Sequence, residues 1–150
     1  MKGKPGPSWT VHVKVPPDKA YAYVADLSRH AEWSFAADKM TIKADKPGPA
    51  VVGSKYSAEG NLMGRNASKV TITALNPPKS LEFESEDRAG INGHRFEFTP
   101  QNGGVLITRQ MFGIKVPFYG PLLFILAKGA IDKDYNGALA NLKTRLESSS

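Results

Sequence analysis

The chain has 150 residues, of which 41% are hydrophobic and 23% charged, with a formal net charge of +6 and no cysteine. The lack of cysteine excludes disulfides, zinc sites with thiolate ligands and a cysteine nucleophile. This size and composition are typical of a globular protein, so we expect a single domain over residues 1–150, with a flexible arm at 1–7 and a frayed tail at 148–150.

The first predicted elements are a strand and two short helices. Apolar residues alternate with polar ones from Trp9 to Val15, as in a strand with one buried face. Pro16 ends this strand because proline has no N–H to donate, and Pro17 suits the first position of a helix. Ser28 is a candidate N-cap for a second short helix that ends near Trp33.

A series of strands and one long helix follow. Alternating apolar residues predict strands over 40–44, 53–60, 68–75, 81–86, 94–98 and 105–111. From Leu122 to Leu146 the apolar spacing changes to three and four, which predicts a helix of about 25 residues. A sheet with one apolar face needs a cover, and this helix is the largest element able to provide it.

Five stretches of the chain carry a family resemblance, in this order: Val13–Ser34, Val52–Tyr56, Leu75–Phe83, Phe96–Pro100 with Gly103–Gly104, and Leu142–Glu147. Together they resemble the START-like (SRPBCC) superfamily, which has the birch pollen allergen fold, and within it the polyketide cyclase/dehydrase-type subfamily. Val105 departs from the pattern, in which threonine follows the glycine pair.

The resemblance implies an α+β helix-grip fold: a curved antiparallel sheet of about seven strands wrapped on one long C-terminal helix, with two short helices after the first strand. It also implies a cavity between sheet and helix. Members bind sterols, lipids, polyketides, hormones or other hydrophobic molecules, and a minority catalyse reactions. The superfamily has no universal catalytic triad, so the resemblance assigns no catalytic residue.

Arg109 shares strand parity with Val105, Ile107 and Met111, the predicted concave face. Its guanidinium could bind an acidic or carbonyl group of a ligand, because it stays charged and carries several donors. Alternatively, it pairs with an internal carboxylate or is turned outward by a bulge, and we favour this structural interpretation. Glu59 would be the natural partner if it faces inward.

His94 has the same parity as Phe96 and Phe98, so it is either a cavity acid, base or donor, or a hydrogen-bonded interior histidine, which we favour. His12 and His30 are expected in solvent. Because the three histidines are separated, with no carboxylate at ligand spacing, we predict no metal site, and we predict no cofactor. Glu82, Glu84 and Glu86 alternate with apolar residues and are expected on a solvated face.

Aromatic and aliphatic residues could line the cavity or simply fill the core. The candidate ligand-binding residues are Trp33, Phe35, Tyr56, Phe83, His94, Phe96, Arg109, Met111, Tyr119, Leu123, Ala127 and Ile131. The candidates for catalysis are His94, Arg109 and Tyr56.

Three functions remain open at this point. The first is binding of a small hydrophobic ligand of lipid, polyketide or aromatic type in an internal cavity between the sheet and the C-terminal helix. The second is a polyketide cyclase/dehydratase-type enzyme acting on such a ligand. The third is a protein-interaction or stress-response module with an incidental cavity. Binding leads because no nucleophile–base pair stands out in the sequence.

The predicted partners follow from charge and hydropathy. Lys and Arg are dispersed, which argues against nucleic-acid binding, although the positive charge allows weak attraction to anionic membranes. The longest apolar stretch, 116–127, is interrupted by proline and glycine and is too short for stable insertion. The lack of cysteine and of an apolar run near Met1 favours a cytoplasmic location.

Overall fold

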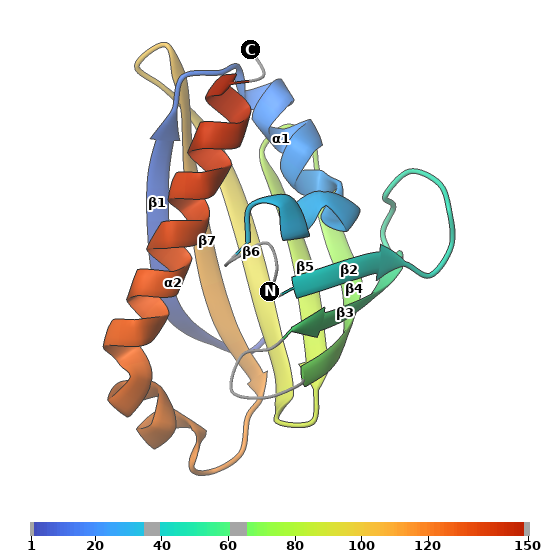
Figure 1. The fold of residues 1–150 in the computed structure, drawn as a ribbon, viewed down its shortest axis with the longest axis vertical. Coiled ribbons are helices and arrows are strands. Elements are labelled where there is room, and N and C mark those ends of the chain that lie inside the picture. The colour runs from blue at the N-terminus through green and yellow to red at the C-terminus, as the bar shows by residue number, and fades with distance from the viewer. Residues whose placement is uncertain (1, 35–39, 61–65, 149–150) are drawn as a thin grey trace.

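Figure 1 shows the fold in a computed structural model, which describes residues 2–34, 40–60 and 66–148. Along the chain lie β1 (Lys4–Val13), α1 (Pro17–Ala25), the 3-10 helix η1 (Leu27–Glu32), β2 (Met40–Ala44), β3 (Lys55–Gly60), β4 (Asn66–Asn76), β5 (Ser80–Asp87), β6 (Gly90–Gln101), β7 (Gly104–Lys115) and α2 (Gly120–Ser148). The predicted order of one strand, two short helices, a series of strands and one long helix is confirmed.

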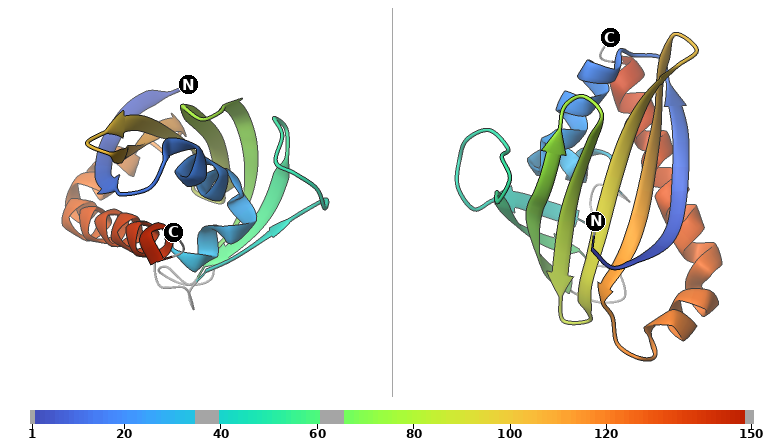
Figure 2. Two further views of the ribbon diagram at one scale, coloured as in Figure 1. Left: turned by 90° about the horizontal axis from the view of Figure 1, so that it is seen from above. Right: turned by 180° about the vertical axis from the view of Figure 1, so that it is seen from behind.

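The seven strands form one antiparallel sheet in the order β1-β7-β6-β5-β4-β3-β2. Strands β2 to β7 are neighbours in chain order, whereas β1 pairs with β7, with Val13 opposite Val105. Seen from above in Figure 2, the sheet curves, and α1, η1 and α2 lie on its concave side. This is the architecture expected of a helix-grip fold.

The sheet has one buried face and one charged face, as its alternation predicts. On β6, Phe96 and Phe98 are buried in the core. The alternating residues Arg95 and Glu97 point to the opposite face of the sheet. Arg95 forms ion pairs there with Glu97, at 2.8 Å, and with Glu82 of β5, at 2.9 Å. The prediction that Glu82 belongs to the outer, charged face is therefore confirmed.

Two predicted boundaries are wrong at the start of the chain. β1 begins at Lys4, so residues 4–7 are strand, not flexible arm, and Lys4 pairs with Gly113. Prolines are tolerated there because β1 is an edge strand, with no second neighbour that needs their N–H. Ser28 is not the cap of η1, because the helix starts at Leu27, after Asp26.

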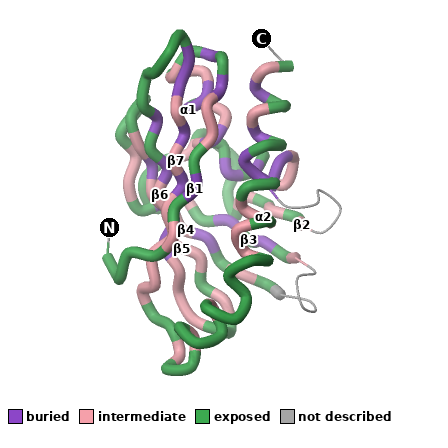
Figure 3. The backbone as a smooth tube through the Cα atoms, turned by 90° about the vertical axis from the view of Figure 1, so that its left-hand side faces the viewer, coloured by how far each residue is buried: buried purple, intermediate pink, exposed green. Residues whose placement is uncertain are grey.

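Only the C-terminal half of α2 packs tightly on the protein. Its buried residues are Ala138, Leu139, Leu142 and Leu146. In Figure 3 the first turns of the helix are coloured as exposed, and the buried positions come later. The helix therefore crosses the sheet at its C-terminal end and projects beyond it at its N-terminal end.

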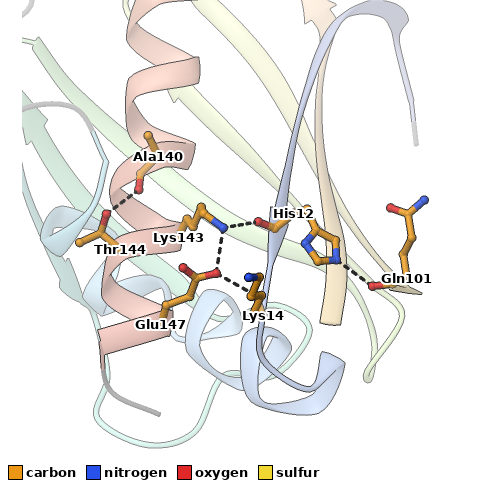
Figure 4. A network of polar contacts seen from close by, with 7 residues as sticks. All are labelled: His12, Lys14, Gln101, Ala140, Lys143, Thr144 and Glu147. Carbon is orange, nitrogen blue, oxygen red and sulfur yellow. Dashed lines mark hydrogen bonds and ion pairs between the residues drawn. The ribbon is translucent and has the colours of Figure 1, made fainter. Parts of the chain in front are cut away.

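Polar contacts fix this C-terminal half against β1 (Figure 4). The Lys143 ammonium donates to the His12 carbonyl at 2.9 Å and pairs with Glu147 at 2.8 Å. The Glu147 carboxylate also accepts a hydrogen bond from the Lys14 backbone N–H at 2.9 Å. His12 is half-buried rather than fully in solvent, and its ring contacts the Gln101 carbonyl at 2.7 Å.

Candidate functional site

A cavity of about 240 Å³ lies on the concave side of the sheet. Its inner wall is made of buried residues, namely Leu27, His30, Ser34, Ala58, Val70, Phe83, His94 and Arg109. Its outer part is lined by residues with partial or full exposure, namely Met40, Ile42, Glu59, Gly60, Ser68, Ser85, Asp87, Asn92, Met111 and Tyr135. Half of the buried lining residues are apolar and half, namely His30, Ser34, His94 and Arg109, are polar, so the inner wall is of mixed character.

The sheet and η1 make up most of this wall. Among the described lining residues, α2 contributes Tyr135, whereas η1 contributes Leu27 and His30. The prediction of a cavity between the sheet and the long helix therefore needs an addition: η1 forms a large part of the cover. The helix period explains why, since Leu27 and His30 are three residues apart and share one face of η1.

Arg109 is a buried cation, with 5% of its surface exposed. Its Nη2 lies 3.3 Å from Nδ1 of His94, and its Cζ lies over the rings of Phe96 and Tyr135, at 5.1 and 4.6 Å. Its Nε and Nη1 are buried and have no hydrogen-bond partner. Among the described residues, none forms an ion pair with it, so the internal carboxylate that we favoured from the sequence is not found there.

The electrostatics of Arg109 follow from this burial. Removal from water disfavours the charged form, which lowers the pKa of the guanidinium from its usual value. Arginine nevertheless keeps its proton in proteins. The inner end of the cavity therefore holds a cation whose charge is balanced by aromatic faces and a neutral ring instead of by a carboxylate.

His94 lies beside this cation and stacks on Phe83, with ring centroids 5.0 Å apart. Burial first, and then the nearby charge of Arg109, lower its pKa well below the usual value. His94 is thus neutral, and because Nδ1 accepts from the guanidinium, its own proton resides on Nε2. The prediction of an interior, hydrogen-bonded histidine is confirmed, and this histidine also lines the cavity.

His30 was expected in solvent, and this was wrong. It is 4% exposed, lines the cavity, and its Nε2 lies 2.7 Å from the Val24 carbonyl, to which it must donate. Burial lowers the pKa of His30 to about 4, so it too is neutral at physiological pH. The signal that could have located it is its spacing from Leu27, because a side chain three residues after a buried leucine shares its face in a 3-10 turn.

The candidate ligand-binding residues fall into three groups. Phe83, His94, Arg109 and Met111 line the cavity. Trp33, Tyr56 and Phe96 are buried, but they pack in the core behind the cavity wall and do not line it. Phe35 lies outside the described residues. Of the three catalytic candidates, the structure brings His94 and Arg109 together and places Tyr56 apart from them.

The third group consists of the helix candidates, which do not line the cavity. Tyr119 and Leu123 are 49% and 54% exposed, Ala127 is also exposed, and Ile131 is half-buried outside the cavity lining. The reason is geometric: these residues lie on or just before the first turns of α2, where the helix projects past the sheet. Tyr135, one turn after Ile131, is the first helix residue to reach the cavity.

Two of the remaining predictions concern carboxylates and metals. Glu59 is exposed at the outer part of the cavity, and none of the contacts between described residues joins it to Arg109. Among the described residues, no cluster of His, Asp and Glu has the composition of a metal site. Nor is any described helix long and apolar enough to cross a membrane.

Comparison with known proteins identifies the family. The family described as Polyketide cyclase / dehydrase and lipid transport matches residues 8–147, so the chain belongs to this family. No curated protein matches the chain in sequence.

Solved structures with low sequence identity share the fold. The protein TTHA0849 from Thermus thermophilus has a TM-score of 0.73 at 15% identity, with 95% of this chain and 97% of that chain covered. Ara h 8.0201 has a TM-score of 0.69 at 10% identity, with 94% and 96% covered. DynU16, a putative protein in the dynemicin biosynthetic locus, has a TM-score of 0.66 at 15% identity, with 95% of this chain but 47% of that chain covered. These likenesses confirm the START-like helix-grip fold.

Proposed function

We propose that this member of the polyketide cyclase/dehydrase and lipid transport family binds a small hydrophobic molecule of lipid, polyketide or aromatic type in its cavity. The observation that carries the proposal is the cavity itself, about 240 Å³ of space whose buried wall combines apolar and polar side chains. Protein interiors are normally close-packed, so a space of this size beside a well-packed core supports a binding role.

The family and the neighbours support the class of ligand but not its identity. A fold of this kind carries many functions, and function depends on the residues of the site. Phe83 and Met111 offer apolar contact area in the wall, and Arg109, His94, His30 and Ser34 are the polar residues of the inner wall. Such a wall favours an apolar ligand body that also carries a polar group.

A filled-cavity variant tests this proposal. Ala58 is a small residue of the inner wall, on β3, and Ala58→Leu would reduce the free volume. Its matched control is Ala67→Leu on β4, which changes an exposed position. We expect a neutral fluorescent probe, N-phenyl-1-naphthylamine, to bind the wild type and the control about equally and the filled variant about tenfold more weakly. Equal binding by all three proteins, or no binding by the wild type, would contradict the proposal.

A second candidate function is catalysis of the cyclase/dehydratase type. One observation favours it: Arg109 Nη2 and His94 Nδ1 meet at 3.3 Å inside the cavity. Arg109 could polarise a ketone oxygen, and the Nε2–H of His94 could donate a second hydrogen bond to that oxygen, which would acidify the protons on the adjacent carbon. The third catalytic candidate, Tyr56, would not take part, because it packs in the core and does not line the cavity.

Hydrogen exchange at carbon tests this second candidate. In heavy water, 2-acetylnaphthalene exchanges the protons next to its carbonyl slowly, and NMR follows the rate. An enzyme of this type would accelerate the exchange, and His94→Phe would abolish the acceleration. A rate equal to that without protein would reject catalysis of this kind and leave binding as the function.

A further inference from the structure

Arg109 carries an unused capacity to bind an anion. A guanidinium has five N–H donors, and Nε and Nη1, which carry three of them, have no partner here. Burying a charge without an opposite charge costs several kcal/mol, so proteins rarely do so unless a function requires it. The buried cation therefore points to a ligand group that would complete its hydrogen bonds.

The neighbours of Arg109 favour a negative group over a neutral one. His94 and His30 are neutral and lie on the same inner wall, and the aromatic rings of Phe96 and Tyr135 contact the cation. The carboxylates that line the cavity, Glu59 and Asp87, lie in its more exposed outer part. The inner wall thus carries the positive charge of Arg109, which would orient a ligand that has one acid group.

We propose that the ligand is an amphipathic carboxylic acid whose carboxylate binds the Arg109 guanidinium at the inner end of the cavity, while its apolar body lies against Phe83, Val70 and Met111. This inference rests on the proposed binding function. A carboxylate can accept two parallel N–H bonds from a guanidinium, and these charge-assisted bonds are the strongest that a side chain offers. The apolar lining then contributes the remaining affinity.

Matched acids and alcohols test the inference. The probes are octanoic acid with 1-octanol, and 2-naphthoic acid with 2-naphthalenemethanol, measured by calorimetry at neutral pH. We expect the wild type to bind the acid of at least one pair about tenfold or more tightly than the alcohol, because a hydrogen bond to a charged group is stronger than one to a neutral group. Arg109→Met should remove this preference and leave alcohol binding within about threefold of the wild type.

The outcomes separate the two proposals. Equal binding of acids and alcohols by the wild type, or an acid preference that survives in Arg109→Met, would overturn the carboxylate inference and leave the binding function intact. No binding of any of the four compounds would contradict the binding function itself. Arg95→Met is the control for the loss of positive charge, because Arg95 lies on the outer face of the neighbouring strand.

A second, independent observation concerns the end of the molecule at which α2 projects beyond the sheet. Seven large apolar residues are exposed there, and we call them the α2 tip: Val116, Phe118, Tyr119, Leu122, Leu123, Ile125 and Leu126. Phe118 is 96% exposed and Leu126 75%. Leu122, Ile125 and Leu126 are spaced three and four apart and form a stripe on the side of the helix away from Phe124 and Ile131, which are half-buried.

The charges around the α2 tip are mainly positive. No Asp or Glu occurs between Glu97 and Asp132, whereas Lys115 and Lys128 bracket the tip. The start of β1 reaches the same end, because Lys4 pairs with Gly113, and the β5–β6 hairpin reaches it through Ile91 opposite Lys115. Together these segments bring five cations (Lys2, Lys4, Arg88, Lys115, Lys128) and three carboxylates (Glu86, Asp87, Asp132).

We infer that the α2 tip docks on an anionic lipid surface. Exposed aromatic and aliphatic side chains between lysines are the pattern of a segment that lies in the membrane interface. A second copy of this chain fits less well, because a symmetric contact between two tips would bring Lys115 of both copies together, whereas Lys128 is paired with Asp132 at 2.7 Å. A docked tip would also place a carrier of hydrophobic molecules at the surface that holds them.

Flotation with lipid vesicles tests the docking. We expect the protein to float with vesicles of phosphatidylcholine and phosphatidylglycerol, and binding to fall about tenfold in Phe118→Ser/Leu126→Ser. The control, Val51→Ser/Val52→Ser, removes two exposed apolar residues elsewhere and should bind as the wild type does. Absence of vesicle binding, equal loss in both variants, or a dimer in sedimentation that the tip variant dissociates would overturn the inference.

Discussion

Removing the buried charge of Arg109 should make the empty protein more stable. In Arg109→Met, a side chain of similar length without charge takes the place of a cation that has no carboxylate partner among the described residues. The wild type bears a desolvation cost of several kcal/mol for this ion. Substitution of methionine removes that cost but keeps most of the apolar contact with Phe96 and Tyr135.

The expected gain in the free energy of unfolding depends on the favourable contacts of Arg109 that the substitution removes. Its hydrogen bond to His94 contributes about 1.5–3 kcal/mol, and each cation–π contact about 0.5–2 kcal/mol. These favourable contacts offset most of the desolvation cost, and we expect Arg109→Met to be more stable by about 2 kcal/mol. For a chain of this size, that corresponds to a rise in Tm of about 4–8 °C.

The assay is urea and thermal unfolding of protein that has been denatured and refolded to remove any bound molecule. Arg95→Met is the matched control, because the same substitution there removes two ion pairs on the outer face and should destabilise by less than about 1 kcal/mol. If Arg109→Met is instead less stable than the wild type by more than about 1 kcal/mol, the cation is compensated in the empty protein and the reasoning fails.

Three further predictions concern stability. The pKa of His30 is near 6.5 in the unfolded chain and about 4 in the native protein, so between these pH values only the unfolded chain binds the proton. The free energy of unfolding should therefore fall by up to about 3 kcal/mol as the pH is lowered from 6.5 to 4. Urea unfolding across this range should show a smaller loss in His30→Gln, and an identical loss would contradict the assignment. Leu142→Ala in the fully buried face of α2 should lower the free energy of unfolding by about 2–5 kcal/mol, and a loss below about 1 kcal/mol would mean that this half of α2 is not part of the core. Gly104→Ala should destabilise the β1–β7 pair, because the added Cβ would lie 2.2 Å from the Val13 carbonyl oxygen; an unchanged Tm would show that the strands separate there at little cost.

The fold could be predicted almost completely from the sequence. The alternation of the strands and the change of period after Pro121 define the elements, and they depend only on which side chains are apolar. The strand parity of Arg109 and His94 placed both on the concave face, because successive side chains in a strand alternate strictly. Parity alone could not show whether a carboxylate would lie opposite Arg109, since that depends on how neighbouring strands and helices meet.

Apart from Tyr56 and Phe96, which pack in the core without lining the cavity, the misplaced site candidates lie in or next to helices. The apolar spacing of α2 continues from Leu123 to Leu146, so the pattern does not reveal where the sheet beneath the helix ends. His30 was missed for a related reason: its three-residue spacing from Leu27 is a weak signal in a 3-10 helix of six residues, and a single histidine among polar neighbours is typical of an exposed position. In both cases, contacts with other elements determine which side chains are buried, and the local sequence pattern carries no information about those contacts.

The pairing of β1 with β7 has a consequence for the order of folding. Strands β2 to β6 pair with their neighbours in chain order and can do so as each is synthesised, whereas β1 has no partner until β7 is complete at Lys115. Contacts this distant in sequence are slow to form because a long loop must close first. Arg109 on β7 and Tyr135 on α2 would therefore join the cavity last, after much of the apolar wall has assembled. Pulsed hydrogen exchange would test this order of folding. The amides of β1 should become protected later than those of β4 and β5, which would mean that Arg109 is buried in the final step.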